Sequence, residues 1–282
     1  MNKKPFYIHV GYGKTATTWL QETLFSKNDE INYFGKTNNN YPKWLKKIHY
    51  LDEYHYMKDE ESIKQFILRQ HLNETNKPSL LSSEAFTNMG YLKSQAIRIK
   101  RIFPNPKIIL ILRNPIDLIE SFYKYNVNEG HFIQKVEHYI DWNTMTFALH
   151  KRPPIYLNDL CFDEVIDYYE KIFKKMNILV LKYEDFVRNP NNFLLSMSNF
   201  LGITFKNVSH LVNQKVLKGS NTSETLLKRK DNFHKFINKM SNEDHFESCI
   251  YNISINDETI IDSDLNRRLS QHFKGRCSMY FY

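Results

Sequence analysis

Short apolar runs alternate along this chain with longer segments in which apolar residues recur at helical spacing. The apolar runs predict buried strands, and they lie at 6–10, 78–84, 107–112 and 177–181. The segments with helical spacing lie at 91–103, 115–123, 163–175 and 190–201. Strands separated by helices imply βαβ units, so we predict an α/β fold with a central parallel sheet flanked by helices on both faces.

Weaker patterns fill the rest of the chain. Residues 31–34 predict a short strand, and apolar stripes within 41–73 predict helices that form either a substrate wall or a packing layer. A helix is expected over 131–149, where two prolines end the pattern. Beyond residue 203 the pattern identifies one further helix, which begins near Ser263 and leads into an aromatic tail.

Residues 6–24, FYIHVGYGKTATTWLQETL, combine a strand, a glycine turn and a helix. Such a turn aims several backbone N–H groups at one point, and the helix dipole adds partial positive charge there. Lys14 contributes a full charge at this point, and further donors come from the hydroxyls of Thr15, Thr17 and Thr18. We call residues 11–18 the anion loop, because this combination predicts a site for a phosphate or sulfate group.

Two families of anion loop must be distinguished. A nucleoside-triphosphate P-loop, G-x-x-x-x-G-K-[ST], would need its first glycine at Ile8, and Gly11 is too close to Lys14 to serve. The segment instead resembles the 5′-phosphosulfate loop of sulfotransferases, roughly P-K-[ST]-G-T-T-W-L after a strand. The positions that match in register are Lys14, Thr15, Thr17, Thr18, Trp19 and Leu20. Gly13 stands where the family usually has proline, and Ala16, with its Cβ, stands where it has glycine.

Two later segments resemble the same family. ILRNPIDLIESFY, residues 111–123, resembles its 3′-phosphate site, in which an arginine and a serine have the spacing of Arg113 and Ser121. An arginine at a strand end offers a bidentate fork for a phosphate. ILVLKYEDFVRNP, residues 178–190, is similar to the strand and loop whose tyrosine lies near the adenine. Tyr183 is the matching tyrosine, and Trp19 matches a tryptophan near the adenine; packing in the core is the alternative role for both.

A late segment is expected to cover the 3′-phosphate. Lys218-Gly219-Ser220 loosely resembles the basic-glycine loop of the family, and Lys274-Gly275-Arg276 is an equal contender. The three resemblances occur in the expected order along the chain. Together they imply a P-loop-like, three-layer fold in a single domain over residues 1–282. The insertion at about 41–75 and the C-terminal part at about 203–282 would then shape the acceptor site.

The resemblance implies the transfer of a sulfuryl group from 3′-phosphoadenosine 5′-phosphosulfate (PAPS), which leaves the product PAP. The acceptor would be a hydroxyl or an amine, with a carbohydrate hydroxyl of a glycan as the leading expectation, and no metal is expected. Lys14 would neutralise the leaving phosphate, by analogy with phosphoryl transfer. A nucleotide kinase and a nucleic-acid-binding protein are the alternatives.

The acceptor hydroxyl requires a base. Ligands of open parallel sheets bind at the carboxyl ends of the strands, and Glu84 ends the second predicted strand there. Glycan sulfotransferases commonly use a glutamate, whereas the cytosolic small-molecule enzymes use a histidine. We therefore predict Glu84 as the base, with His131 and His138 as rivals and a strand-end salt bridge as its alternative role.

Composition and charge narrow the expected partners and cellular compartment of the protein. The net charge of +8 fits an anionic cofactor, but the basic residues are scattered and no nucleic-acid-binding motif is present, so no nucleic-acid partner is expected. Three widely spaced cysteines form no CxxC pair, which favours a reducing compartment. No signal-peptide pattern and no apolar window of ~18–20 residues occurs. We therefore expect a soluble, cytoplasmic protein of undetermined oligomeric state.

Overall fold

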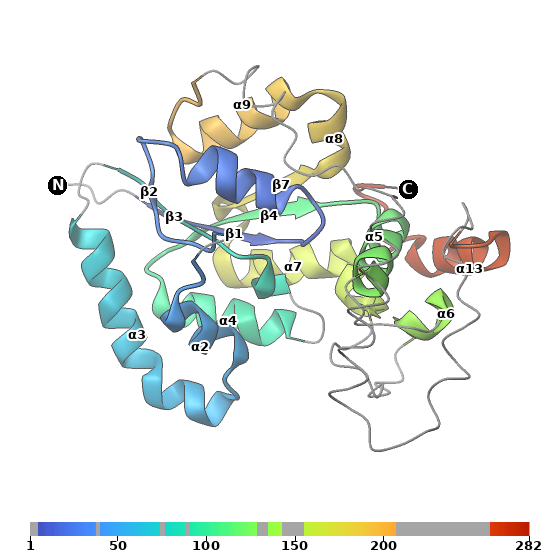
Figure 1. Ribbon diagram of the computed structural model, residues 1–282, viewed down its shortest axis with the longest axis horizontal. Coiled ribbons are helices and arrows are strands. Elements are labelled where there is room, and N and C mark those ends of the chain that lie inside the picture. Colours follow the sequence, from blue (N-terminus) through green and yellow to red (C-terminus); the bar gives the residue numbers. More distant parts are fainter. Residues whose placement is uncertain are drawn as a thin grey trace. The chain divides into compact units, whose positions relative to one another are not determined.

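The computed structural model describes residues 5–37, 40–73, 77–87, 91–128, 135–142, 155–206 and 260–281 (Figure 1). The chain forms two compact units. The first consists of Met1–Arg113 with Glu164–Val216, and the second of Asn114–Asp163 with Leu217–Tyr282.

The first unit is built on a five-stranded sheet in the order β2-β3-β1-β4-β7. Every neighbouring pair in this sheet is parallel, as the sequence predicts. The strands are β1 (Phe6–Gly11), β2 (Asn32–Tyr33), β3 (Ser79–Ser82), β4 (Lys107–Leu112) and β7 (Ile178–Lys182). The central strands β1 and β4 are apolar throughout because both of their faces are buried. The short strand expected near residues 31–34 is confirmed as β2, at the edge of the sheet.

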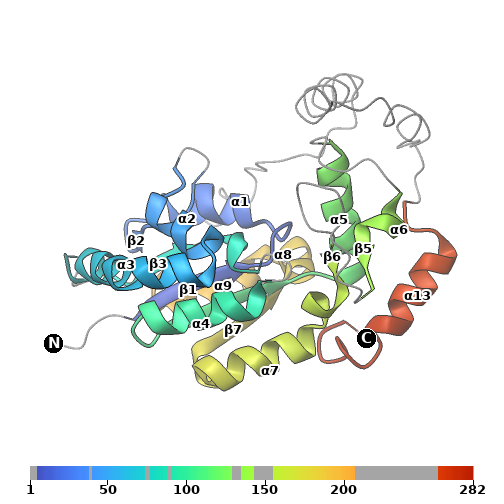
Figure 2. The ribbon, with the colours of Figure 1, turned by 90° about the horizontal axis from the view of Figure 1, so that it is seen from below.

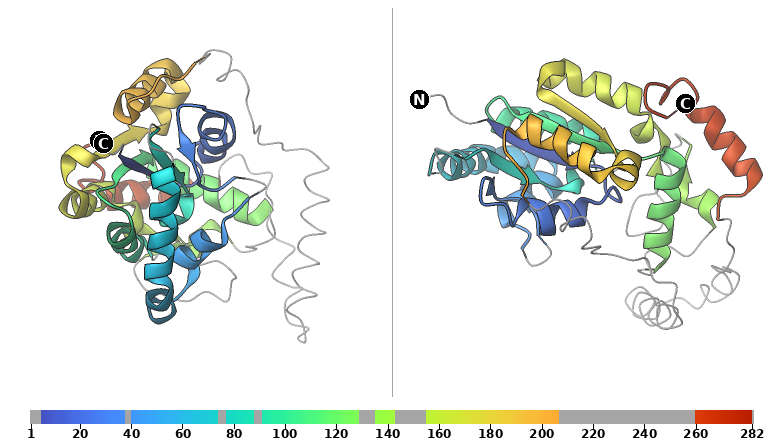
Figure 3. Two further views of the ribbon diagram at one scale, coloured as in Figure 1. Left: turned by 90° about the vertical axis from the view of Figure 1, so that its left-hand side faces the viewer. Right: turned by 90° about the horizontal axis from the view of Figure 1, so that it is seen from above.

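Helices cover both faces of this sheet. In Figure 1, α8 and α9 lie on one face and α2 and α4 on the other; Figure 2 shows the second pair in front of the sheet, and the right panel of Figure 3 shows α9 in front of it. The helices are α1 (Thr17–Trp19), α2 (Lys43–Tyr50), α3 (Glu53–Asn73), α4 (Leu92–Ile102), α8 (Tyr183–Arg188) and α9 (Pro190–Leu201). Helix α7 (Phe162–Phe173) begins at the boundary of the two units. The shorter helical segments are a π-helix, Leu20–Phe25, and the 3₁₀ helices Glu84–Thr87 and Lys175–Asn177.

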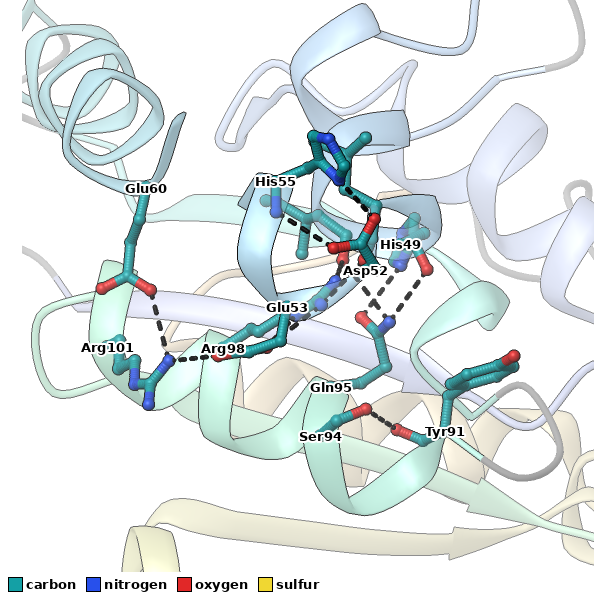
Figure 4. A network of polar contacts seen from close by, with 12 residues as sticks. His49, Asp52, Glu53, His55, Glu60, Tyr91, Ser94, Gln95, Arg98 and Arg101 are labelled. Atoms are coloured by element: carbon teal, nitrogen blue, oxygen red, sulfur yellow. Dashed lines mark hydrogen bonds and ion pairs between the residues drawn. The ribbon is translucent and has the colours of Figure 1, made fainter. Parts of the chain in front are cut away.

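A buried arginine of α4 helps to hold the helices of the insertion (Figure 4). Arg98 is 5% exposed, and it donates to the carbonyl oxygens of Ile48 and, at 2.8 Å, Leu51, which end α2. It also pairs with Glu53 at 3.1 Å, and its guanidinium carbon lies 4.2 Å from the centre of the Tyr56 ring. The last carbonyl groups of a helix need such donors. This part of the insertion is therefore a packing layer, and its role as a substrate wall stays a prediction.

The second unit contains α5 (Pro115–Asn128), α6 (Val136–Tyr139), β5 (Ile140–Asp141), β6 (Ile155–Tyr156), a 3₁₀ helix (Leu157–Leu160) and α13 (Ser263–Phe273). In Figure 2, α13 runs beside α5. Pro115 begins α5 as expected, and the Asn114 side chain caps it by accepting from the backbone N–H of Ile116 at 3.0 Å.

The prediction of one helix over 131–149 is wrong at its centre. Helix α6 ends at Tyr139, and the next two residues, Ile140 and Asp141, form a parallel pair with Ile155 and Tyr156. Both Ile140 and Asp141 are buried. Pairing with a distant segment thus decides their conformation, and local periodicity carries no sign of it.

Candidate active site at the carboxyl edge of the sheet

The anion loop follows β1 and is shaped by two residues in the left-handed region. Lys14 has φ 64° and Ala16 has φ 62°. A turn with left-handed residues gathers backbone N–H groups into a concave anion site. Ala16 occupies the position where the family usually has glycine, and its φ explains that preference. The departure at Ala16 thus retains the turn at some conformational cost.

Exposure alternates along the loop. Lys14, Ala16 and Thr18 are partly exposed, whereas Gly13, Thr15 and Thr17 are buried. The Thr15 hydroxyl donates to the carbonyl oxygen of Tyr12 at 2.5 Å, so it ties the loop together internally. Lys14 and Thr18 are therefore the polar side chains of the loop that are partly exposed.

Gly11 joins the anion loop to the segment that follows β3. Its φ is +116°, and a Cβ at this position would lie 2.6 Å from Thr87 Oγ1 and 3.3 Å from the Cα atom of Glu84. Only glycine permits this approach. The close packing sets Glu84 beside the anion loop, as its place at the end of a neighbouring strand predicts.

Arg113 connects the ends of three strands. It follows β4, and its Nη1 donates to the carbonyl oxygen of Lys14 at 3.1 Å. Its guanidinium carbon also lies 4.9 Å from the centre of the ring of Tyr183, which follows β7. Lys14, Arg113 and Tyr183 are thus brought together as predicted. Ser121 belongs to α5 in the second unit, so its joint action with Arg113 on one phosphate stays a prediction.

Trp19 is 7% exposed and belongs to the core between the sheet and the helices. The centre of its ring lies 5.1 Å from that of Phe186 in α8. The packing role considered for Trp19 therefore matches its surroundings, and a contact with adenine stays a prediction. Tyr183, by contrast, is partly exposed.

Glu84 begins the 3₁₀ helix after β3, and both of its carboxylate oxygens are bound. Oε2 accepts a hydrogen bond from Gln21 Nε2 at 3.1 Å, and Oε1 forms an ion pair with Lys36. Burial alone would raise the pKa of Glu84. The charge and hydrogen bond of Lys36, with hydrogen bonds from the backbone N–H of Glu84 and from Gln21, outweigh burial and hold that pKa below its ordinary value.

A buried polar chain lies behind Glu84. Gln21 Nε2 also donates to Ser82 Oγ at 3.1 Å, and Ser82 Oγ lies 2.7 Å from Nδ1 of His9. His9 is fully buried, and burial lowers its pKa to about 4 although the Glu84 charge acts in the opposite direction. Sequence reasoning missed the residues Gln21, Lys36, Ser82 and His9. One signal was available for Gln21, which lies one helical turn after Thr17 and Thr18.

The remaining predicted site residues fall outside the described residues or in the second unit. His131, Lys218, Gly219 and Ser220 are outside the described residues, and His138 belongs to α6 of the second unit. Among the contenders that follow α13, Arg276 is bound within its own unit, since its Nη1 lies 3.3 Å from Oδ1 of Asn158.

The described residues include neither a metal-binding cluster nor a membrane-spanning helix. No cluster there holds three His, Cys, Asp or Glu side chains arranged for a metal ion. No helix in those ranges has the length and apolarity that a membrane crossing requires.

Comparison with known proteins gives a family match over most of the chain. The model of the sulfotransferase domain matches residues 5–274. The solved structure of a sulfotransferase from Alicyclobacillus acidocaldarius is similar in fold, with a TM-score of 0.53 and 17% identity. The similarity covers 85% of this chain and 95% of that chain. The predicted α/β, P-loop-like fold is thereby confirmed.

Two more distant structures have TM-scores below 0.5. The sulfotransferase domain from the curacin biosynthetic pathway has a TM-score of 0.45 and 15% identity, over 81% of this chain and 97% of that chain. Mouse sulfotransferase SULT7A1 complexed with PAP has a TM-score of 0.39 and 14% identity, over 98% of this chain and 90% of that chain. No curated protein matches the sequence.

Proposed function

Since the chain belongs to the sulfotransferase family, we propose that it transfers the sulfuryl group of PAPS to a carbohydrate hydroxyl, with Glu84 as the base. PAPS is the cofactor of the family, and it supplies a sulfuryl group activated by its bond to a phosphate oxygen. The family match gives no support to the nucleotide kinase or the nucleic-acid-binding protein.

The residues at the carboxyl edge of the sheet fit this cofactor. The anion loop, with its left-handed turn and the partly exposed Lys14 and Thr18, suits the 5′-phosphosulfate. Arg113 suits the 3′-phosphate, because one of its N–H groups holds the loop while the guanidinium has five such donors. Tyr183 packs on this guanidinium, and by its resemblance to the family tyrosine it would contact the adenine side of the cofactor.

We assign the remaining cofactor contacts by resemblance. Ser121 would close on the 3′-phosphate from α5, and Lys218 with Gly219 would cover it. The family match spans both units, which supports one sulfotransferase domain.

Each residue has a separate task in the transfer. The acceptor oxygen forms its bond to sulfur as the bond from sulfur to the phosphate oxygen breaks, and the acceptor proton passes to the Glu84 carboxylate. The ammonium group of Lys14 offsets the charge that collects on the departing oxygen. Fixed positive groups at the loop perform this stabilisation, so the proposal includes no metal.

The environment of Glu84 is the observation that carries the assignment of the base. Its side chain is 27% exposed, adjoins the anion loop and is held in the ionised form. The histidines nearby, His9 and His49, are 0% and 6% exposed, so an acceptor in solvent cannot reach them. A carboxylate base supports a hydroxyl acceptor of the carbohydrate type.

Transfer of radiolabelled sulfate from PAPS to a panel of glycans, lipids and phenols tests this function. We expect label in a glycan, and none with the Lys14→Ala variant. Label in phenols alone would refute the carbohydrate acceptor, and the absence of both transfer and PAP binding would refute the assigned site.

A further inference from the structure

We propose that Lys36 is a positioning residue for sulfuryl transfer, which orients the Glu84 carboxylate and keeps it ionised until the acceptor proton arrives. This inference rests on the proposed role of Glu84 as the base. Lys36 lies outside every motif that resembles the family. It follows the two-residue edge strand β2, and the structure brings it to Glu84 from 48 positions away in the sequence.

Three contacts fix the backbone around Lys36, and two of them are made to β3. The N–H of Lys36 donates to the carbonyl oxygen of Ser82 at 3.0 Å, and the Tyr33 hydroxyl donates to the carbonyl oxygen of Lys36. Gly35 packs so closely that a Cβ there would lie 2.5 Å from the Ser82 nitrogen. These contacts therefore place Lys36 beside Ser82, which ends β3 two residues before Glu84.

The carboxylate is held from two directions. Lys36 binds Oε1 from the loop after β2, while Gln21 binds Oε2 from the helix that continues the anion loop. Each carboxylate oxygen has more than one lone pair, so both contacts leave room for an acceptor proton. The two side chains thus fix the direction of the base relative to the loop that would hold the sulfuryl donor.

Among the described residues, Lys36 is the charged side chain that contacts Glu84. Around them lie His9 on β1, Tyr33 on β2, Tyr41 before α2 and His49 on α2. Burial lowers the pKa of both histidines to about 4 and raises the pKa of both tyrosines, so all four are uncharged near neutral pH. After proton transfer, the ammonium group favours loss of the proton from Glu84 to solvent, because the side chains of Lys36 and Glu84 are 31% and 27% exposed. The base is thereby restored for the next turnover.

The variants Lys36→Met, Lys36→Arg and Lys46→Met form a matched set. Lys46 is exposed and lies over the same ring as Lys36, since the Nζ atoms of both lie within 6 Å of the centre of the Tyr41 ring: 5.5 Å for Lys46 and 5.9 Å for Lys36. Lys46→Met therefore removes a nearby charge and leaves the Glu84 ion pair in place. Lys36→Arg retains the charge, so it should rescue the function.

Two readouts test the proposal. We expect the acidic limb of the pH profile of kcat/KM to move to higher pH by about 1–2 units in Lys36→Met, the usual effect of an adjacent opposite charge. Lys36→Arg should restore the limb, and Lys46→Met should leave it unchanged. Titration of ¹³C-labelled glutamate by NMR, with the Glu84 signal assigned by its loss in Glu84→Gln, should show the same shift without any acceptor. Thermal unfolding and calorimetric binding of PAP identify variants that fail to fold.

The two readouts separate this inference from the proposed function. If folded Lys36→Met titrates like the wild type in the NMR experiment, Lys36 is a structural ion-pair partner and the proposal is overturned. If the Glu84 signal shifts but the protein neither binds PAP nor transfers sulfate, the proposed function fails while the control of Glu84 by Lys36 stands.

Discussion

The guanidinium group of Arg113 donates a hydrogen bond to the carbonyl oxygen of Lys14 at 3.1 Å. This bond joins the ends of β4 and β1, two neighbouring interior strands of the sheet. A residue proposed to bind the 3′-phosphate therefore also supports the loop proposed to bind the 5′-phosphosulfate. Changes at Arg113 should affect both ends of the cofactor, though unequally.

Arg113→Ala should weaken PAP binding by about 2–5 kcal/mol, because a buried phosphate would lose its charged partner. AMP lacks the 3′-phosphate, so its binding should weaken only by the amount that Arg113 contributes through its support of the anion loop. Calorimetry with both nucleotides measures the difference, and Arg101→Ala, which changes an exposed arginine of α4, is the control. Equal losses for PAP and AMP would assign Arg113 to loop support alone.

Gly11 and Gly202 form a matched pair for testing the packing of the anion loop. Both have positive φ, but a Cβ at Gly202 would meet nothing within 4 Å. Gly202→Ala should cost about 1–2 kcal/mol of stability, because alanine is strained in the left-handed region even where its Cβ has space. Gly11→Ala should cost about 1–3 kcal/mol more through overpacking against Thr87 and Glu84, and it should also reduce activity.

Chemical denaturation and turnover of the two alanine variants check this prediction. Adding Thr87→Ala to Gly11→Ala removes the atom 2.6 Å from the new Cβ and should recover part of the stability. If Gly11→Ala loses no more stability than Gly202→Ala, the close contact between the anion loop and the Glu84 segment does not contribute to stability.

Much of the sheet could be predicted because its strands are locally encoded. β1 and β4 are apolar on both faces, and parallel strands buried in this way appear in the sequence as continuous apolar runs. The positions of Lys14, Glu84 and Arg113 at strand ends follow from the same pattern. The grouping of Lys14, Arg113 and Tyr183 followed from the general rule for ligand sites in parallel sheets.

The partners of Glu84 could not be predicted in the same way. Lys36 reaches Glu84 because β2 pairs with β3 in one register, and a strand of two residues gives no pattern from which that register can be inferred. Gln21 reaches it through the rotation of a π-helix, which differs from the α-helix expected there. The contact of Gly11 with Thr87 likewise depends on tertiary packing.

His9 and His49 should make the protein unstable in mild acid. Burial lowers the pKa of both from 6.5 to about 4, so the unfolded chain binds protons first as the pH falls. The contribution of the two neutral histidines to the free energy of unfolding is present above pH 6.5 and is lost between pH 6.5 and about 4. In that window two protons correspond to a slope of up to about 3 kcal/mol per pH unit.

Denaturant titrations from pH 7 to pH 4.5 measure this slope. His49→Gln should reduce it to about half, relative to the variant's own stability at pH 7, because one of the two titrating groups is gone. His55→Gln removes a histidine whose side chain is 60% exposed and serves as the control. A flat profile between pH 6.5 and 4.5 would contradict the prediction.

Lys14→Ala should reduce turnover by more than it reduces PAP affinity. The ammonium group is proposed to act on charge that develops during transfer, and such charge is absent from bound PAP. Steady-state kinetics and calorimetry give the two losses. Because the loop supplies its own positive charge, EDTA should leave the wild-type rate unchanged. Inhibition by EDTA that Mg²⁺ reverses would favour kinase-like chemistry.

Glu84→Gln provides the decisive test of the base and of the acceptor class. Glutamine keeps the shape of the side chain but cannot take a proton, so PAP binding should survive while turnover falls roughly 100- to 10,000-fold. In the wild type, the low pKa of Glu84 should keep the carboxylate ionised in acid for as long as the protein stays folded.

The comparison of acceptors completes this test. A sugar hydroxyl is a very weak acid and should depend strongly on the carboxylate, whereas a phenol loses its proton easily and should depend on it less. The ratio of the two losses in Glu84→Gln therefore reports proton transfer and is insensitive to general damage, which would lower both rates equally. If the variant sulfates the true acceptor at a near-normal rate, Glu84 is a structural ion-pair partner of Lys36. The base would then have to be sought at His131, at His138 or among the acidic residues of 50–61.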